Sequence, residues 1–309
     1  MKSVKSVVAF MNILLVNIDS VIPNFALAKV ERYHRDNGDD IRYDLEIFKP
    51  WADKIYVSCI FTKNKNLCLP WVSDNTLVGG TGWDIHSKLP AEIDKVKPKI
   101  NWGFTTRGCV RHCGFCFVPE KEGKLHVVGD IYDIWDGHAK DITLMDNNIL
   151  GASGHFRKIC AQLRHEKLRV DFNQGLDIRL LTPSLMKELK TIRHKEYHFA
   201  WDGRLDLSDK FRWLYKNLKR TTVYVLCGYN TTFKQDLDKF NTLKKIGHNG
   251  FCMRYETVVH DKNYTLLARW VNQHHIFQTH TFKEFLELTS SGKQRKDKIS
   301  ADLMKMAGN

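Results

Sequence analysis

From residue 99 onward the chain repeats one unit, in which an apolar run of strand length is followed by a polar tip and a helical segment. Strands that alternate with helices form a parallel sheet, and the carboxyl ends of such strands meet at one edge. Active sites of α/β proteins lie at that edge. The chain is therefore predicted to be α/β, with its site beside the polar tips. The six predicted strands span residues 100–105, 141–149, 168–172, 197–201, 222–227 and 250–255.

The helical segments between these runs show apolar residues three and four positions apart, which is the spacing of an amphipathic helix. We expect a helix to begin at Pro183, since proline favours the first turn. The other predicted helices span residues 127–135, 154–166, 208–218 and 234–246.

A smaller α/β layer precedes this series. The continuous apolar run 12–18 is typical of a strand that is covered on both faces. A helix is expected over 25–36, and further strands at Asp44–Phe48 and Lys54–Phe61. The glycine cluster from Val78 to Gly82 is predicted to be a turn, because it lacks a complete phosphate-binding motif.

The segment 90–99 is predicted to be a linker or connecting helix, which places a domain boundary near residue 95. The expected division is an N-terminal domain 1–95, a core 96–260 and a C-terminal extension 261–309. The extension should contain two helices and end in a polar, basic, solvated tail from Ser290 onward, for which a nucleic-acid-binding arm is the alternative.

Three cysteines, Cys109, Cys113 and Cys116, form a C-x3-C-x2-C run directly after the first predicted core strand. Thiolates are the usual protein ligands of iron–sulfur clusters. A structural zinc site needs a fourth Cys or His, and His112 points in a poor direction because it adjoins Cys113. Three ligands without an obvious fourth indicate a cluster with one iron left open.

Eight cysteines without regular spacing do not resemble a secreted disulfide framework. Cys59, Cys227 and Cys252 lie in apolar runs and are predicted to be buried free thiols. We therefore expect a reducing, cytoplasmic location. The one apolar run near the N-terminus is far too short to span a membrane.

The net charge of +13 and the pI near 9.3 make the chain basic. This surplus is explained equally well by a lysine-rich soluble surface and by affinity for nucleic acid. Because the basic residues are scattered, no single motif decides between these explanations.

The cysteine motif, with Phe115 before its last cysteine and with its place after the first core strand, resembles the radical S-adenosylmethionine (SAM) superfamily over roughly residues 99–255. The N-terminal layer resembles members that carry a cobalamin-binding-like domain before the radical core. The resemblance implies a partial (β/α)6 barrel preceded by a small Rossmann-like α/β domain.

The resemblance also implies the cofactors. Cys109, Cys113 and Cys116 would hold three irons of a [4Fe-4S] cluster, and SAM would chelate the fourth. An external one-electron donor such as flavodoxin or ferredoxin would reduce the cluster. Cleavage of SAM would then give methionine and a 5′-deoxyadenosyl radical, which abstracts hydrogen from a substrate; the protein positions the cofactors and excludes water.

Several SAM contacts follow from the same resemblance, each with a simpler alternative. Phe115 would pack near the cluster and adenine, and Asp146 or Asn147 would contact the methionine amino group, although the expected glycines are missing there. Arg179 would pair with the SAM carboxylate or form a salt bridge with Asp177. Asp202 would bind the ribose or belong to a turn. Met253 would back the adenine or belong to the core.

The chain departs from two subclasses of the family, those that bind cobalamin and those that carry a second N-terminal cluster. No Asp-x-His-x-x-Gly run is present, and His34 is expected on the surface of its helix, so cobalamin is predicted to be absent or weakly bound. Only Cys59 and Cys68 are available for a second N-terminal cluster, which makes such a cluster unexpected.

The leading hypothesis is a SAM-cleaving enzyme with one cluster and an unidentified substrate, with tRNA or another nucleic acid modestly favoured. A non-enzymatic nucleic-acid-binding protein is the rival, with zinc or an iron–sulfur cluster on the same thiols and His112 or His126 as a further zinc ligand. A third hypothesis is a protein that assembles the cluster but turns over nothing.

Overall fold

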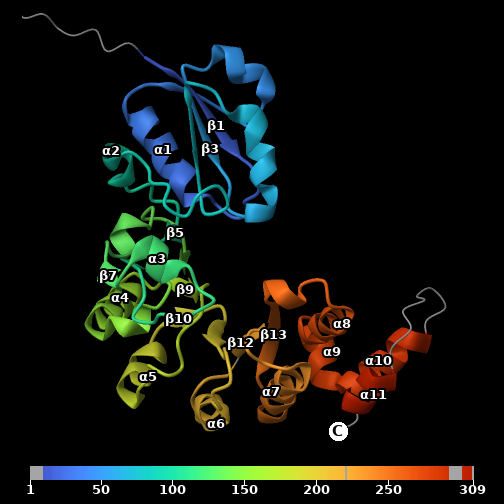
Figure 1. Ribbon diagram of the computed structural model, residues 1–309. Coiled ribbons are helices and arrows are strands. Elements are labelled where there is room, and N and C mark those ends of the chain that lie inside the picture. Colours follow the sequence, from blue (N-terminus) through green and yellow to red (C-terminus); the bar gives the residue numbers. More distant parts are fainter. Residues whose placement is uncertain (1–9, 220, 292–300, 308–309) are drawn as a thin grey trace, which may run out of the picture.

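A computed structural model describes residues 10–219, 221–291 and 301–307 of the chain (Figure 1). The N-terminal sheet domain lies above the rest of the molecule in this view, and the last helices lie at the right. The chain is α/β, and its larger sheets are parallel throughout. None of the helices among these residues is long and apolar enough to cross a membrane.

The N-terminal domain contains one four-stranded sheet in the order β2–β1–β3–β4. Its strands are β1 (Asn12–Asn17), β2 (Asp40–Tyr43), β3 (Lys54–Ser58) and β4 (Thr76–Gly79). Its helices are α1 (Phe25–Asp36) and α2 (Ala91–Asp94), and two 3-10 segments are η1 (Glu46–Trp51) and η2 (Thr62–Trp71).

Side chains of β1 alternate between two apolar layers, because successive residues of a strand point to opposite faces. Ile13 and Leu15 pack with Val30 of α1, and Leu14 and Val16 belong to the cluster that contains Trp71 of η2. Both faces of this sheet are therefore covered, as the continuous apolar run predicts.

Two expectations for this domain are wrong. Asp44–Phe48 is not a strand: the strand is β2, and Asp44 adopts φ +51° and accepts a hydrogen bond from the backbone of Asn17. This strand lies at the edge of the sheet and is half-exposed, so its residues do not form the continuous apolar run by which a buried strand is predicted. His34 is not on the surface: it is 4% exposed, with Nδ1 2.6 Å from Asp39 and Nε2 3.1 Å from the Tyr56 hydroxyl.

The core carries two further parallel sheets, in the orders β10–β9–β8–β5 and β11–β12–β13. An isolated parallel bridge between Leu176 and Phe199 lies between them. Apart from a small hairpin formed by residues 106–107 and 126–127, the strands follow one another in chain order. Their bounds are β5 (Trp102–Gly103), β8 (Asp141–Leu144), β9 (Arg169–Phe172), β10 (Arg193–His194), β11 (Tyr197–Ala200), β12 (Thr221–Cys227) and β13 (Asn249–Arg254).

One large apolar cluster unites the core helices with the C-terminal helices, since it includes Phe156, Phe240, Trp270 and Leu303. The helices are α3 (Val118–Glu122), α4 (Ser153–His165), α5 (Pro183–Leu189), α6 (Ser208–Asn217), α7 (Phe233–Ile246), α8 (Lys262–Val271), α9 (His274–Thr279), α10 (Phe282–Ser291) and α11 (Ala301–Ala307). Short 3-10 segments are η3 (Ile131–Asp133), η4 (Ile149–Gly151) and η5 (Glu256–Val258).

The predicted helix 127–135 is wrong. Val127 belongs to strand β7 (His126–Val127), and a capping box between Asp130 and Asp133 starts only the short η3 segment. The predicted strand 100–105 shrinks to β5, because Asn101 adopts φ +60°. Of the predicted solvated tail, residues 292–300 lie outside the described part of the chain, whereas 301–307 form α11 with Leu303 buried.

All eight cysteines are free. Cys59, Cys227 and Cys252 are buried, as predicted, and so are Cys68 and Cys160. The glycine cluster at 79–82 is a tight turn, because Gly80 has φ +98° and a Cβ there would overlap the carbonyl of Cys59. A Cβ on Gly82 would lie 2.5 Å from the backbone of Phe61, so packing accounts for both glycines.

Candidate functional site

The three-cysteine segment is a closed loop between two short paired strands. Strand β6 (Thr106–Arg107) pairs antiparallel with β7, and the backbone N–H of Cys109 donates to the Gly123 carbonyl over 3.3 Å. Gly108 has φ +75°, and a Cβ there would overlap the carbonyls of the returning chain. We call residues 109–116 the cysteine loop.

Glu122, at the end of α3, joins both ends of this loop to the tip of β8. Its carboxylate lies 2.7 Å from Arg107 Nη2 and accepts hydrogen bonds from the Gly108 N–H at 2.9 Å and from Asn147 Nδ2 at 2.7 Å. Charge-assisted bonds of this kind are among the stronger hydrogen bonds in proteins. Asn147, a predicted SAM contact, therefore holds the loop through Glu122, a residue that the sequence reasoning did not single out.

Asp146 contacts the two threonines that precede the loop. It is 5% exposed, and its Oδ1 accepts hydrogen bonds from the backbone and the hydroxyl of both Thr105 and Thr106. Burial raises the pKa of Asp146, although these hydrogen bonds act in the opposite direction. Its Oδ2 is buried without a hydrogen-bond partner.

The three thiols are half-buried and lie within reach of one another's charge. Burial raises the pKa of Cys113 and of Cys116, and the neighbouring thiols raise both further. The Arg179 guanidinium acts on Cys113 in the opposite direction. Cys109 Sγ accepts weak bonds from the Arg111 N–H at 3.3 Å and from Asn148 Nδ2 at 3.6 Å. Asn148 Oδ1, like Asp146 Oδ2, is buried without a partner.

Arg179 follows β9 and forms a bidentate pair with Asp177, with Nε at 2.7 Å and Nη2 at 2.9 Å from its two carboxylate oxygens. Arg111 of the cysteine loop reaches the same carboxylate at 3.1 Å. Burial acts to raise the pKa of Asp177, but Arg179 and Arg111 lower it below its usual value. The salt bridge that was one alternative for Arg179 is therefore present, and the contact of Arg111 with the same carboxylate ties the loop to the tip of β9.

Asp202 follows β11, and its Oδ1 accepts a hydrogen bond from the Leu226 N–H over 3.3 Å. Burial raises the pKa of Asp202, and the charge of Arg179 lowers it. The charge of Asp202 in turn raises the pKa of both Cys113 and Cys116.

An aromatic chain connects the loop to the tips of β12 and β13. The ring of Phe115 lies 5.1 Å from that of Tyr229, edge to face, and Tyr229 lies 5.1 Å from Tyr255. A Cβ on Gly114 would lie 2.5 Å from the Tyr229 hydroxyl, so the glycine permits this approach. Sequence reasoning missed Tyr229, although the Gly-Tyr-Asn tip after β12 is visible in the sequence.

The structure thus brings Asp146, Asn147, Arg179 and Asp202 near the cysteine loop, to which Phe115 itself belongs. Met253 lies on β13 as the register partner of Leu226, and it is 44% exposed rather than part of the core.

Among the described residues, no three His, Cys, Asp or Glu side chains lie close enough together to hold a metal ion. A single zinc ion requires its ligands about 2.1–2.3 Å from one point.

Two histidines were considered above as further zinc ligands. His112 and His126 are both exposed, and His126 Nδ1 lies 2.9 Å from the carbonyl of Lys124.

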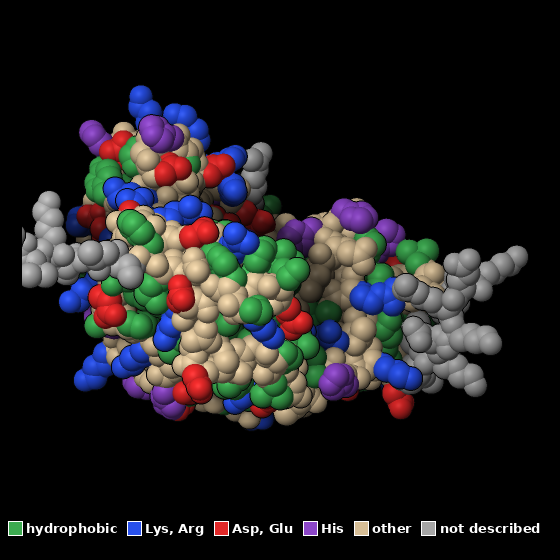
Figure 2. Space-filling model, turned by 90° about the horizontal axis from the view of Figure 1, so that it is seen from above, with side chains coloured by type: hydrophobic (Ala, Val, Ile, Leu, Met, Phe, Trp, Pro, Cys, Tyr) green, Lys and Arg blue, Asp and Glu red, His purple; other side chains and the backbone are tan. Residues whose placement is uncertain are grey.

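The N-terminal domain reaches the same region. The Phe25 ring of α1 lies 5.6 Å from Phe104, just before the loop, and Lys121 of α3 donates to the Thr81 hydroxyl over 3.3 Å. In the view from above, the surface is hollowed between the larger left part of the molecule and the lobe on the right (Figure 2).

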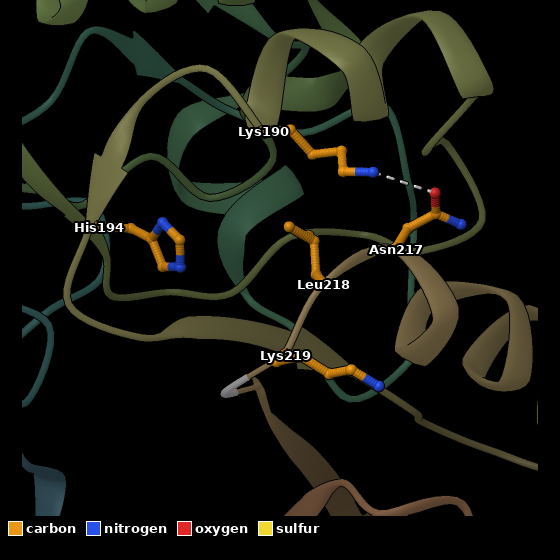
Figure 3. A pocket seen from close by; sticks show the side chains of 5 residues that line it. All are labelled: Lys190, His194, Asn217, Leu218 and Lys219. Atoms are coloured by element: carbon orange, nitrogen blue, oxygen red, sulfur yellow. Dashed lines mark hydrogen bonds between the residues drawn. The ribbon is translucent and has the colours of Figure 1, made fainter.

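Two open pockets lie elsewhere. One, of about 370 Å³, is lined by Lys190 directly after α5, His194 of β10 and the end of α6 (Figure 3). The dashed line in that figure joins Lys190 Nζ to Asn217 Oδ1 over 3.4 Å. The other lies between α6 and α7 and includes Arg212 and Lys245. Neither pocket includes a residue of the cysteine loop.

A scan against protein-family models and a search of the curated proteins give no match for this chain.

Proposed function

We propose that the protein is a radical SAM enzyme that binds one [4Fe-4S] cluster and cleaves SAM to modify a substrate. The observation that carries this proposal is the fixation of the cysteine loop by the tips of successive parallel strands. Glu122 and Asp146 hold it at the tip of β8, Asp177 at β9, and Tyr229 at β12. The strands that follow in chain order support a partial (β/α)6 barrel, with the Rossmann-like domain before it.

In this proposal Cys109, Cys113 and Cys116 bind three irons, and the thiols give up their protons on binding because thiolates are the ligands. When bound, the cluster would supply the single electron for reductive cleavage of SAM, and an external donor such as flavodoxin or ferredoxin would provide that electron.

The residues around the loop then have defined tasks. The carboxyl group of Asp202 accepts hydrogen bonds from a ribose hydroxyl group. Arg179, already ordered by Asp177, presents its remaining N–H groups to the SAM carboxylate. Phe115, held by Tyr229, covers the loop and excludes water. Asp146 and Asn147 hold the loop in place, which leaves the amide oxygen of Asn148 for the methionine amino group.

The test is anaerobic reconstitution of the full chain with iron and sulfide, followed by SAM and dithionite. The wild type should bind about four irons and release 5′-deoxyadenosine. Cys113→Ala should lose both, whereas Cys160→Ala, which removes a thiol from α4, should retain both. Equal iron content and equal 5′-deoxyadenosine release in the two variants would refute the proposal.

In this proposal the substrate is a nucleic acid, and the enzyme acts in the cytoplasm. The charge of +13 supports such a partner, and Lys and Arg side chains are spread over the surface in Figure 2. Binding of a labelled tRNA should weaken as salt rises from 50 to 200 mM, roughly tenfold or more, because phosphate contacts release counterions. Affinity that is independent of salt would count against this substrate class.

A further inference from the structure

The two open pockets described above share the second half of helix α6. In the first, Lys190 and Lys219 lie on opposite sides of the buried Leu218 (Figure 3). The second, of about 400 Å³, lies between α6 and α7 and is lined by Lys216 and Lys245 among others. Because one helix borders both pockets, we treat them together. We call their basic residues Lys190, Arg212, Lys216, Lys219 and Lys245 the α6 surface.

The α6 surface carries positive charge that the surrounding side chains do not neutralise. No Asp or Glu lines either pocket. Its four lysines are exposed, and none of them is paired with a carboxylate in the part of the chain that the structure describes. Arg212 is the exception, since it pairs with Asp209. Because like charges repel, this concentration of lysines is better explained by an anionic partner than by the stability of the fold.

A contact between Lys219 and Tyr215 joins the two pockets. Lys219 lines the first pocket, and its Nζ lies 3.5 Å from the centroid of the Tyr215 ring, which lines the second. A cation over an aromatic ring is held by the charge distribution of the ring. Lys216 and Arg212 are four positions apart and so share one side of α6. The positive charges therefore form one continuous surface around the end of this helix.

The composition of the α6 surface favours phosphate groups over a protein partner. Protein interfaces have an apolar, aromatic core that is poor in lysine. Here Leu218 is 6% exposed, and among the described residues that line the two pockets none is a large, exposed hydrophobic side chain. Lysine binds phosphate as a point charge, and such contacts position a nucleic acid without reading its sequence.

The α6 surface lies at the opposite end of the core strands from the cysteine loop. Lys219 comes two residues before β12, and Tyr229, which contacts Phe115 of the loop, comes two residues after it. The seven residues of β12 cover roughly 20 Å, at about 3.3 Å for each residue. A helical nucleic-acid strand advances about 3.4 Å for each nucleotide. A strand that reaches both places must therefore contain at least about six nucleotides.

From these features we propose that the α6 surface binds the phosphate backbone of a nucleic acid, another part of which reaches the cysteine loop. The lysines would fix the position of the bound molecule on the protein, irrespective of its sequence. The binding surface follows from its own charges and pockets. The assignment of the bound nucleic acid as the substrate rests on the proposed function.

The test compares two double variants of the reconstituted full chain, each of which loses two exposed lysines. Lys216→Ala/Lys219→Ala changes the α6 surface. Lys262→Ala/Lys283→Ala is the matched control, because these lysines of α8 and α10 are also exposed and have no carboxylate partner among the described residues. Binding of a labelled tRNA is measured by fluorescence anisotropy between 50 and 200 mM salt.

Lys216→Ala/Lys219→Ala should bind the tRNA about tenfold more weakly than the wild type at 100 mM salt. The slope of log affinity against log salt should fall by about two, which is about one for each lost phosphate contact. The control should stay within about twofold of the wild type. An affinity within twofold of the wild type in Lys216→Ala/Lys219→Ala, or an equal loss in both variants, would overturn the inference.

An anionic membrane is the competing partner for a group of lysines. Vesicles of phosphatidylcholine and phosphatidylserine in equal parts test it with the same proteins. If Lys216→Ala/Lys219→Ala loses vesicle binding and keeps its affinity for tRNA, the α6 surface binds lipid and the inference is wrong.

SAM cleavage without nucleic acid separates this inference from the proposed function. It should change less than twofold in both double variants, since neither pocket includes a residue of the cysteine loop. If the wild type cleaves no SAM but Lys216→Ala/Lys219→Ala weakens tRNA binding as expected, the proposed function fails and the binding surface stands. If SAM is cleaved and this variant binds tRNA as the wild type does, the binding surface fails and the proposed function stands.

Discussion

The N-terminal sheet and the β11–β13 sheet are both parallel, yet helical segments cover both faces of the first and only one face of the second. Leu14 and Ile13, neighbours on β1, are each fully buried in different layers. Cys252 and Met253, neighbours on β13, are 4% and 44% exposed. In the N-terminal sheet, both faces of a parallel strand are buried. In the β11–β13 sheet, one face of β13 stays partly exposed.

The largest expected loss of stability is at Leu14, in the sheet that is covered on both faces. Leu14→Ala should lower the free energy of unfolding by about 2–5 kcal/mol, because it removes buried methyl groups and leaves a cavity. Urea unfolding monitored by circular dichroism measures this change. A loss below 1 kcal/mol would mean that the second face of this sheet is not packed as described.

The next effect concerns the carboxylate that joins β9 to the cysteine loop. Asp177→Asn should cost about 1.5–3 kcal/mol at neutral pH, as expected for hydrogen bonds to a charged group. The pKa of Asp177 is lowered in the folded protein, so its contribution is present above the unfolded-state value near 4 and is lost as the pH falls through the folded value.

Unfolding of wild type and Asp177→Asn measured from pH 7 down to pH 3 checks this sign. The difference between the two free energies should become smaller toward the acid end. A difference that stays constant over this range would show that the ion pairs with Arg179 and Arg111 do not stabilise the fold.

A smaller effect is expected at Glu122, which holds the loop rather than the core. Glu122→Gln should lower stability by about 1 kcal/mol, through loss of the ionic bond to Arg107, and should reduce the iron retained after desalting. Glu120→Gln, on the exposed side of α3, is the control and should retain wild-type iron content. Equal iron loss in both variants would show that Glu122 does not support the cysteine loop.

The smallest effect lies on the open face. Phe251→Ala should change the free energy of unfolding by about 1 kcal/mol or less, since the ring loses one aromatic contact and little buried area. The same denaturation experiment measures it. A loss of unfolding free energy similar to that of Leu14→Ala would contradict the comparison, because the two faces would then be equally packed.

Much of the fold could be predicted from local patterns. The helix 25–36 matches its predicted bounds, and the long strands β1 and β12 follow their apolar runs closely. The failures have physical causes. The edge strand Asp40–Tyr43 is half-exposed and polar, and the segment 127–135 contains Gly129 and a cap that sustains only one short turn.

The site was partly predictable for a different reason. The cysteines and the strand tips are local features, so the sequence indicates them, and their gathering at one edge follows from parallel pairing. Glu122 and Tyr229 were missed because their partners are 14 to 114 residues away in the chain or on another strand tip. Periodicity contains no information on which distant side chains meet.

The contact between Lys121 and Thr81 has a consequence for synthesis of the protein. Every strand of the N-terminal sheet lies before residue 80, and the first cysteine of the loop comes about thirty residues later. Domains fold as units during translation, starting from the N-terminus. We therefore expect Thr81 and Phe25 to be in place before the cysteine loop leaves the ribosome, so that the loop would emerge onto a surface already folded.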